Sequence, residues 1–235
     1  METSELIDIL AADAAPVRPL TAPWLRTSVW FLISGAYIAI LIVAMSHGGT
    51  RLLSIRFSRF WLEQAAAIGT GIAAAAAAAL SVIPGRSRRW PIVPAFPLTV
   101  WLGILASGCM RDWAQHGAAG LMPQPDWPCS MAMLFGAALP AAALTFSVRR
   151  GAPLAPATTA ALIGLAAGAL SSVVACVSRP MPHPTTMTVV VWHLGTLFAM
   201  AVAVSVGGRS LLPWPLNPRL AAAIENRSVR AGRAQ

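Results

Sequence analysis

Six stretches of the chain are each about twenty residues long, strongly apolar and free of Asp, Glu, Lys and Arg. A helix needs roughly 20 such residues to cross about 30 Å of hydrocarbon. Backbone polar groups inside a bilayer have to be satisfied within the protein, and a helix satisfies them within its own segment. We therefore predict an all-α polytopic membrane protein, a bundle of six transmembrane helices. The predicted spans are residues 27–45, 64–83, 90–109, 130–148, 158–177 and 188–206.

Two of these spans have unusual sequences. The second contains a polyalanine run, residues 73–79, which supplies little insertion energy, so a buried helix of the soluble kind is the alternative to a transmembrane span. The third opens with Pro91, Pro94 and Pro97, and proline is tolerated in a first turn but breaks a helix interior. We expect its regular helix to begin near Phe96.

The composition excludes an ordinary soluble domain and argues against direct nucleic-acid binding. The chain is 57% hydrophobic and 11% charged, whereas soluble domains average about 25% charged residues. All 17 basic residues are arginine, and the formal charge is +9. The arginines lie in short gaps between apolar runs and form no basic stripe, so a membrane explains them better than a nucleic acid does.

The distribution of arginine predicts the orientation, because cytoplasmic loops retain positive charge. With the N-terminus inside, twelve arginines are cytoplasmic and five are external. We therefore expect an inner-membrane protein with both termini in the cytoplasm. Its predicted parts are a cytoplasmic arm, residues 1–26, a membrane domain, residues 27–206, and a mostly disordered cytoplasmic tail, residues 207–235.

This orientation places every cysteine and histidine on the outer side. They are Cys109, Cys129, Cys176, His47, His116, His183 and His193. Two roles stay open at this point. Cys109 and Cys129 are candidates for a disulfide worth about 3 kcal/mol, and a mixed cysteine and histidine set is a candidate for a soft or borderline metal ion. The spacing matches no recognised metal motif, so no metal ligands are assigned.

Catalytic and transport features are absent from the sequence. The spans hold no carboxylate or arginine at mid-membrane, where transporters place ion and substrate sites. No nucleophile elbow, phosphate loop or zinc-protease motif occurs. We expect no enzyme and no cofactor. Gly164 and Gly168 form a small-residue face that favours helix packing, with a dimer contact as the alternative, so the sequence assigns no oligomeric state.

The N-terminal arm has the pattern of a short docking helix. Thr3 or Ser4 is placed to cap a helix over residues 5–15 that Pro16 ends. One face of this helix carries Leu6, Ile9, Leu10 and Asp13, flanked by Glu5 and Asp8. An acidic helix is repelled by anionic lipid, so a basic protein partner suits it better than the membrane surface.

Several ordered motifs resemble the NrsF-type membrane anti-sigma factors, over about residues 4–210. The first is the arm itself, residues 5–20. The others are residues 84–90, Gly108-Cys109 with Asp112-Trp113, Asp126-Trp127 with Cys129, residues 149–154, and residues 191–195.

The resemblance implies a six-span protein whose cytoplasmic arm holds an extracytoplasmic-function sigma factor inactive. It makes Glu5, Leu6, Asp8, Ile9, Leu10 and Asp13 the candidate sigma-binding residues. It also implies sensing of redox or heavy-metal stress at outward cysteines, so Cys129, Cys176, Cys109 and His183 are the candidate sensing residues. Where relatives are expected to carry Cys-Pro, this chain has Met181-Pro182, which makes Cys129 the firmer member of a sensing pair with Cys176 or Cys109. The alternative function is a small transporter or metal-handling membrane protein.

Overall fold

The structure is a computed structural model that describes residues 20–45, 58–83, 85, 87, 89–151, 155–178 and 185–212. Within these residues it is helical, and six helices are long and apolar enough to cross a membrane. This confirms the predicted all-α, six-helix fold class. The first five spans contain α2 (Pro23–Met45), α3 (Ser58–Ser81), α4 (Ala95–His116), α5 (Trp127–Arg149) and α6 (Pro156–Ser178). The sixth consists of α7 (Thr186–Val189), the π-helical segment η4 (Val190–Leu194) and α8 (Gly195–Val206).

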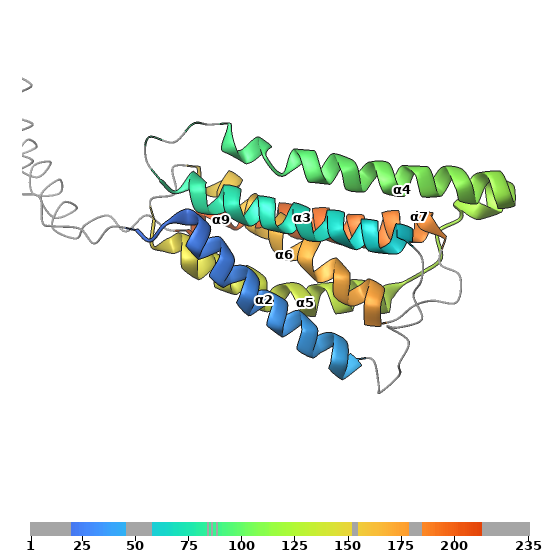
Figure 1. Cartoon of the computed structure of the whole chain (residues 1–235), viewed down its shortest axis with the longest axis horizontal. Coiled ribbons are helices and arrows are strands. Elements are labelled where there is room, and N and C mark those ends of the chain that lie inside the picture. Colours follow the sequence, from blue (N-terminus) through green and yellow to red (C-terminus); the bar gives the residue numbers. More distant parts are fainter. Residues whose placement is uncertain are drawn as a thin grey trace, which may run out of the picture.

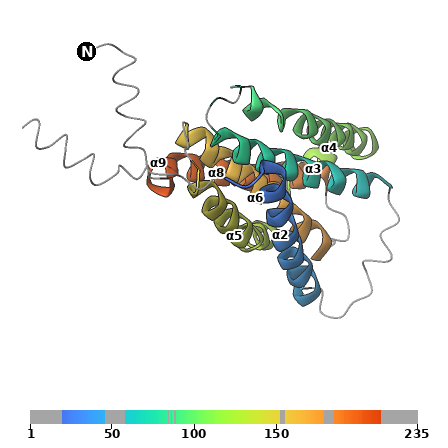
Figure 2. The same cartoon turned by 60° about the vertical axis from the view of Figure 1, so that its left-hand side comes forward.

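The helix α6 lies at the centre of the bundle and packs mainly against α3, α5 and α8. Figure 1 shows α4 along one side and α2 along the other, with α3 and α6 between them, and Figure 2 shows the same order from a second direction. Within the most apolar part of each span, 72% of α6 and 56% of α3 is buried, against 17% of α2 and 22% of the third span. The central helices therefore face protein, and the outer ones expose apolar side chains.

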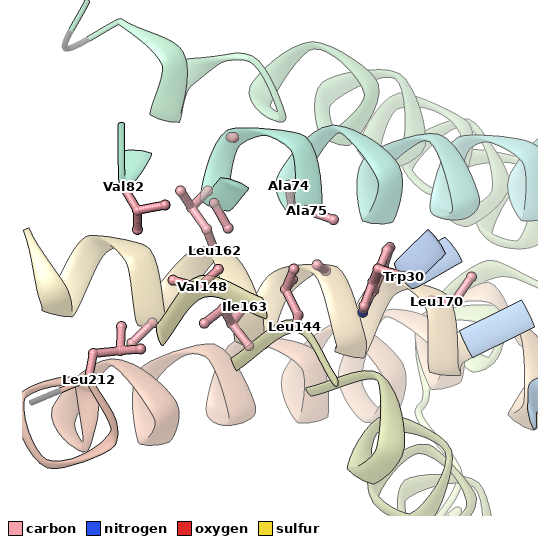
Figure 3. Close-up of a cluster of buried hydrophobic side chains, with 14 of the residues drawn as sticks. Trp30, Ala74, Ala75, Val82, Leu144, Val148, Leu162, Ile163, Leu170 and Leu212 are labelled. Carbon is pink, nitrogen blue, oxygen red and sulfur yellow. The ribbon is translucent and has the colours of Figure 1, made fainter. Parts of the chain in front are cut away.

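Burial explains the polyalanine run. Ala74, Ala75, Ala77, Ala78 and Ala79 are at most 1% exposed, and α3 packs closely along α6. Small side chains let two backbones approach closely, which stabilises helix pairs without strong hydrophobicity. Figure 3 shows larger side chains filling the space beside this contact, among them Trp30, Leu144 and Ile163. The second span is thus a protein-buried helix that is also long enough to cross a membrane.

The small-residue face of α6 is occupied within the chain. A Cβ placed on Gly164 would lie 2.7 Å from the Cα of Ala201, and one on Gly168 would lie 3.3 Å from Cγ of Leu197. Both neighbours belong to α8. This face therefore packs against α8, as the packing interpretation predicted, and is covered by this chain rather than left for a second copy.

The prolines of the third span define where its regular helix starts. Residues Trp90–Ile92 form the 3₁₀ turn η2, and α4 begins at Ala95, which agrees with the start predicted near Phe96. Gly117 ends α4 with φ of 58°, a left-handed conformation that favours glycine, and the 3₁₀ turn η3 (Gly117–Leu121) follows.

The start of the predicted C-terminal tail is structured. Gly208–Leu211 forms the short helix α9 against α6, and Leu212 is buried. Residues 213–235 and most of the N-terminal arm, residues 1–19, lie outside the described residues.

Candidate functional site

One end of the bundle joins α4, α5 and the sixth span through polar contacts, and we call it the cysteine end. Oδ2 of Asp112, in the last turns of α4, accepts a hydrogen bond from the backbone N–H of Thr186 at 2.6 Å. The backbone N–H of Gln124, just before α5, donates to Oγ1 of Thr188 at 3.0 Å. These bonds fix the first turn of the sixth span against its two neighbours.

At this end three buried side chains of different chemistry lie together, and we call them the thiol cluster. They are Asp126, Cys129 and His193, each at most 4% exposed. A carboxylate oxygen, the thiol sulfur and an imidazole nitrogen all lie within 4.8 Å of one another. Among the described residues, this is the group of histidine, cysteine and acidic side chains whose geometry suits a metal ion.

The first turn of α5 positions two members of the thiol cluster. Asp126 is the N-cap of α5, and its Oδ1 accepts a hydrogen bond from the backbone N–H of Cys129 at 3.3 Å. Asp is among the preferred N-cap residues, and Pro128 in the first turn lacks an N–H that would need an acceptor. The same three-residue spacing that caps the helix therefore brings the carboxylate beside the cysteine.

The sixth span supplies the third member from a widened helical turn. His193 lies in η4, where the backbone is π-helical between α7 and α8. Such π-helical turns are rare and occur frequently at functional sites. In this turn His193 is buried whereas Val191 is exposed.

Two further contacts hold η4 and α8 against α5 on either side of the thiol cluster. The rings of Trp127 and Trp192 pack edge to face with centroids 4.7 Å apart. Oγ1 of Thr196 donates to Oγ of Ser130 at 3.0 Å. The cluster thus lies in a seam between two helices that is fixed by neighbouring contacts.

The opposite end of the bundle joins the start of α2 to the end of α5, and we call it the arginine end. Nε of Arg26 donates to Oγ of Ser147 at 3.2 Å, and its Nη2 donates to the carbonyl oxygen of Ser147. Nε of Arg149 donates to the carbonyl oxygen of Leu211 at 2.6 Å. The guanidinium of Arg150 lies 4.8 Å from the ring centre of Phe146.

The helix α5 is common to both ends. It carries Cys129 in its first turn and Ser147, the partner of Arg26, in its last turn. With 23 residues it spans about 34 Å at 1.5 Å per residue. The thiol cluster and the contact with Arg26 therefore lie at opposite ends of one helix, which also contains Pro140 in its interior.

The structure brings one predicted sensing residue, Cys129, into the thiol cluster. Cys109 lies in α4, about two turns before the helix ends at His116, outside that cluster; it is partly exposed and is a free thiol, so the Cys109–Cys129 disulfide is not formed in the structure. Cys176 lies in the last turn of α6, and its side chain is outside the described part of the chain. His183 and the predicted sigma-binding residues Glu5, Leu6, Asp8, Ile9, Leu10 and Asp13 also lie outside it.

Sequence reasoning placed His193 only in the general set of outer cysteines and histidines and did not select Asp126 as a site residue, although both gave a signal. His193 is the one ionisable side chain between residues 188 and 206, and ionisable residues inside spans usually mark function. Asp126 precedes a first-turn proline, which is the pattern of a helix N-cap. Their proximity depends on how the spans pack, which the linear sequence does not show.

Comparison with known proteins identifies a family. The family model NrsF, described as negative regulator of sigma F, matches residues 10–214. No curated protein and no protein of solved structure is significantly similar to the chain.

Proposed function

This chain belongs to the NrsF family of negative regulators of sigma F, and we propose that it holds an extracytoplasmic-function sigma factor inactive at the bacterial inner membrane. The match over residues 10–214 is the observation that carries this proposal. This match favours a regulatory function over the alternative of a small transporter or metal-handling membrane protein. The family is one of regulators, so we assign the chain no catalytic activity.

The N-terminal arm is our proposed sigma-binding segment. The apolar face of Leu6, Ile9 and Leu10 suits a hydrophobic groove, and the flanking acids suit a basic groove rim. Arg26, the last residue of the predicted arm, lies in the first turn of α2 and donates to Ser147 in the last turn of α5. A cytoplasmic arm at this position is able to respond to movements of the bundle.

The stress signal enters, in our proposal, at the cysteine end, which faces the periplasm. Redox chemistry or a heavy metal at Cys129 changes the contact between α5 and the sixth span. In this proposal a shift of α5, which also contains Pro140 in its interior, reaches Arg26 and the arm and releases the sigma factor. Rearrangement of packed helices is a common form of switching, and it needs a bias of only a few kcal/mol between two packings.

Replacement of Leu6 and Leu10 by alanine tests the arm. We expect the double variant to turn on the sigma-dependent reporter without stress, because the helix loses most of its apolar face, while membrane-fraction blots show normal protein levels. Val17→Ala removes apolar atoms beyond the predicted helix and is the matched control, with repression retained. Repression that survives the double variant, or deletion of residues 2–15, would remove the arm from the mechanism.

Serine variants of the three cysteines test the sensing proposal. Cys129→Ser should abolish or strongly reduce reporter induction by an oxidant or a soft metal, with Cys176→Ser next in effect and Cys109→Ser the weakest. Maleimide labelling before and after stress checks which thiols react. Normal induction in the triple variant would show that the signal enters elsewhere, and His116 and His183 would then be the next residues to replace.

A further inference from the structure

The thiol cluster offers three donor atoms of the kinds that bind transition metals. Cys129 offers sulfur, His193 nitrogen and Asp126 oxygen, and all three side chains are buried. Structural and catalytic zinc sites use these three donor types. Calcium and magnesium prefer oxygen donors alone, so this donor set favours a thiophilic cation.

The charge of the loaded site suits its apolar surroundings. Cys129 belongs to a core cluster with Trp101, Leu105, Met133 and Leu197, where an unbalanced charge is costly. A thiolate, a carboxylate and a neutral imidazole together carry two negative charges, which one divalent cation neutralises. On metal binding the Cys129 thiol loses its proton to solvent, and the thiolate, the carboxylate and the divalent cation together form an electrically neutral site.

The distances leave room for one ion. Donor atoms around a tetrahedral ion with bonds of about 2.0–2.3 Å lie roughly 3.3–3.8 Å apart. The three donors already lie within 4.8 Å of one another, so side-chain adjustment of about 1–1.5 Å is sufficient. The Trp127–Trp192 and Thr196–Ser130 contacts hold the two helices at this separation.

We propose that Asp126, Cys129 and His193 bind one thiophilic divalent cation of the zinc and cadmium class, which joins the first turn of α5 to η4. Three protein ligands leave the fourth tetrahedral position to a water or another donor. The sensory role of this site rests on the proposed function, whereas metal binding itself does not. A bound cation holds α5 against the sixth span. The contact between these two elements is the one that we propose the stress signal alters.

Cobalt titration of the purified full-length protein in detergent micelles, after chelation and reduction, tests the site. We expect one equivalent of Co²⁺ to produce a thiolate-to-cobalt charge-transfer band, and one equivalent of Zn²⁺ or Cd²⁺ to abolish it. Cys129→Ser should remove the band. His193→Gln and Asp126→Asn should each weaken cobalt binding at least about tenfold. Because asparagine at residue 126 still caps α5, unfolding of the helix does not explain the weaker binding of Asp126→Asn.

Cys109→Ser is the matched control, because it removes a thiol at the same end of the bundle but outside the cluster, and we expect it to retain the band. Absence of a thiolate band in the wild type, or a band that disappears in Cys109→Ser and persists in Cys129→Ser, would overturn the inference. The readout needs no sigma factor. A protein that represses the sigma factor and binds no cobalt contradicts this inference alone, and one that binds cobalt without repressing contradicts the proposed function alone.

Discussion

Asp126 shows how one buried side chain serves both local structure and the candidate site. Its Oδ1 accepts the backbone N–H of Cys129, a donor that has no acceptor within its own helix because it lies in the first turn. A carboxylate has two acceptor oxygens, so the cap leaves the second available to another partner. Capping and site geometry therefore depend on the same residue, and a variant has to be chosen to separate them.

Asp126→Ala and Asp126→Asn make that separation in metal-free protein. We expect alanine to lower the free energy of unfolding by about 1 kcal/mol, because the helix loses its cap, and asparagine to lower it much less. The measurement is unfolding by titration with sodium dodecyl sulfate in mixed micelles, followed by circular dichroism with chelator present. Equal losses for the two variants would assign the effect to the carboxylate charge instead of the cap.

Among the helices, α6 is the one whose surface is most determined by its neighbours. Its glycines lie where α8 approaches, and its other faces meet α3 and α5. A glycine in a helix is unfavourable by about 1 kcal/mol relative to alanine. Its presence at such a contact is explained by the close approach of the neighbouring backbone, which leaves no room for a Cβ. A glycine on an open surface of another helix provides the comparison.

Gly164→Ala and Gly103→Ala test this explanation as a pair. The new methyl group of Gly164→Ala meets the backbone of Ala201 at 2.7 Å, so we expect the free energy of unfolding to fall by about 1–3 kcal/mol. A Cβ on Gly103 of α4 has no neighbour within 4 Å, so that variant should be unchanged or more stable by up to about 1 kcal/mol. The same micellar unfolding titration compares them, and equal effects would contradict the proposed packing role.

On the scale of the whole molecule, the two ends of the bundle differ in chemistry. The cysteine end carries the thiol cluster and the Asp112 contact. The arginine end carries Arg26, Arg149 and Arg150. Excess positive charge is typical of the cytoplasmic side, which is why we propose that the arginine end faces the cytoplasm.

Reporter fusions test that orientation. Fusions after Leu20, within residues 85–89 and after Arg219 should report a cytoplasmic position, and a fusion near Gly117 should report an external one. The reason is the twelve-to-five division of arginines between the two sides. An external result for the fusion after Arg219 would contradict an arrangement with both termini in the cytoplasm.

The sequence predicted the helices because length and hydropathy are local properties of each span, and it predicted the start of α4 because proline acts locally. It did not predict which helices are central. Which helices are central depends on how each helix packs against the others, as the alanines of α3 and the glycines of α6 show. The same distinction applies to the site: the sequence singled out Cys129 as a candidate sensing residue, whereas its proximity to Asp126 and His193 requires α5 and η4 to pack together.

The buried position of α3 also affects how the protein is made. Of the six spans, α3 has the least apolar sequence, so it partitions from the translocation channel into lipid with the weakest drive. Its main partner, α6, is synthesised only after α4 and α5. We therefore expect α3 to depend during biogenesis first on the contacts that it makes with α2 and α4, and membrane insertion to be a cooperative process instead of six independent steps.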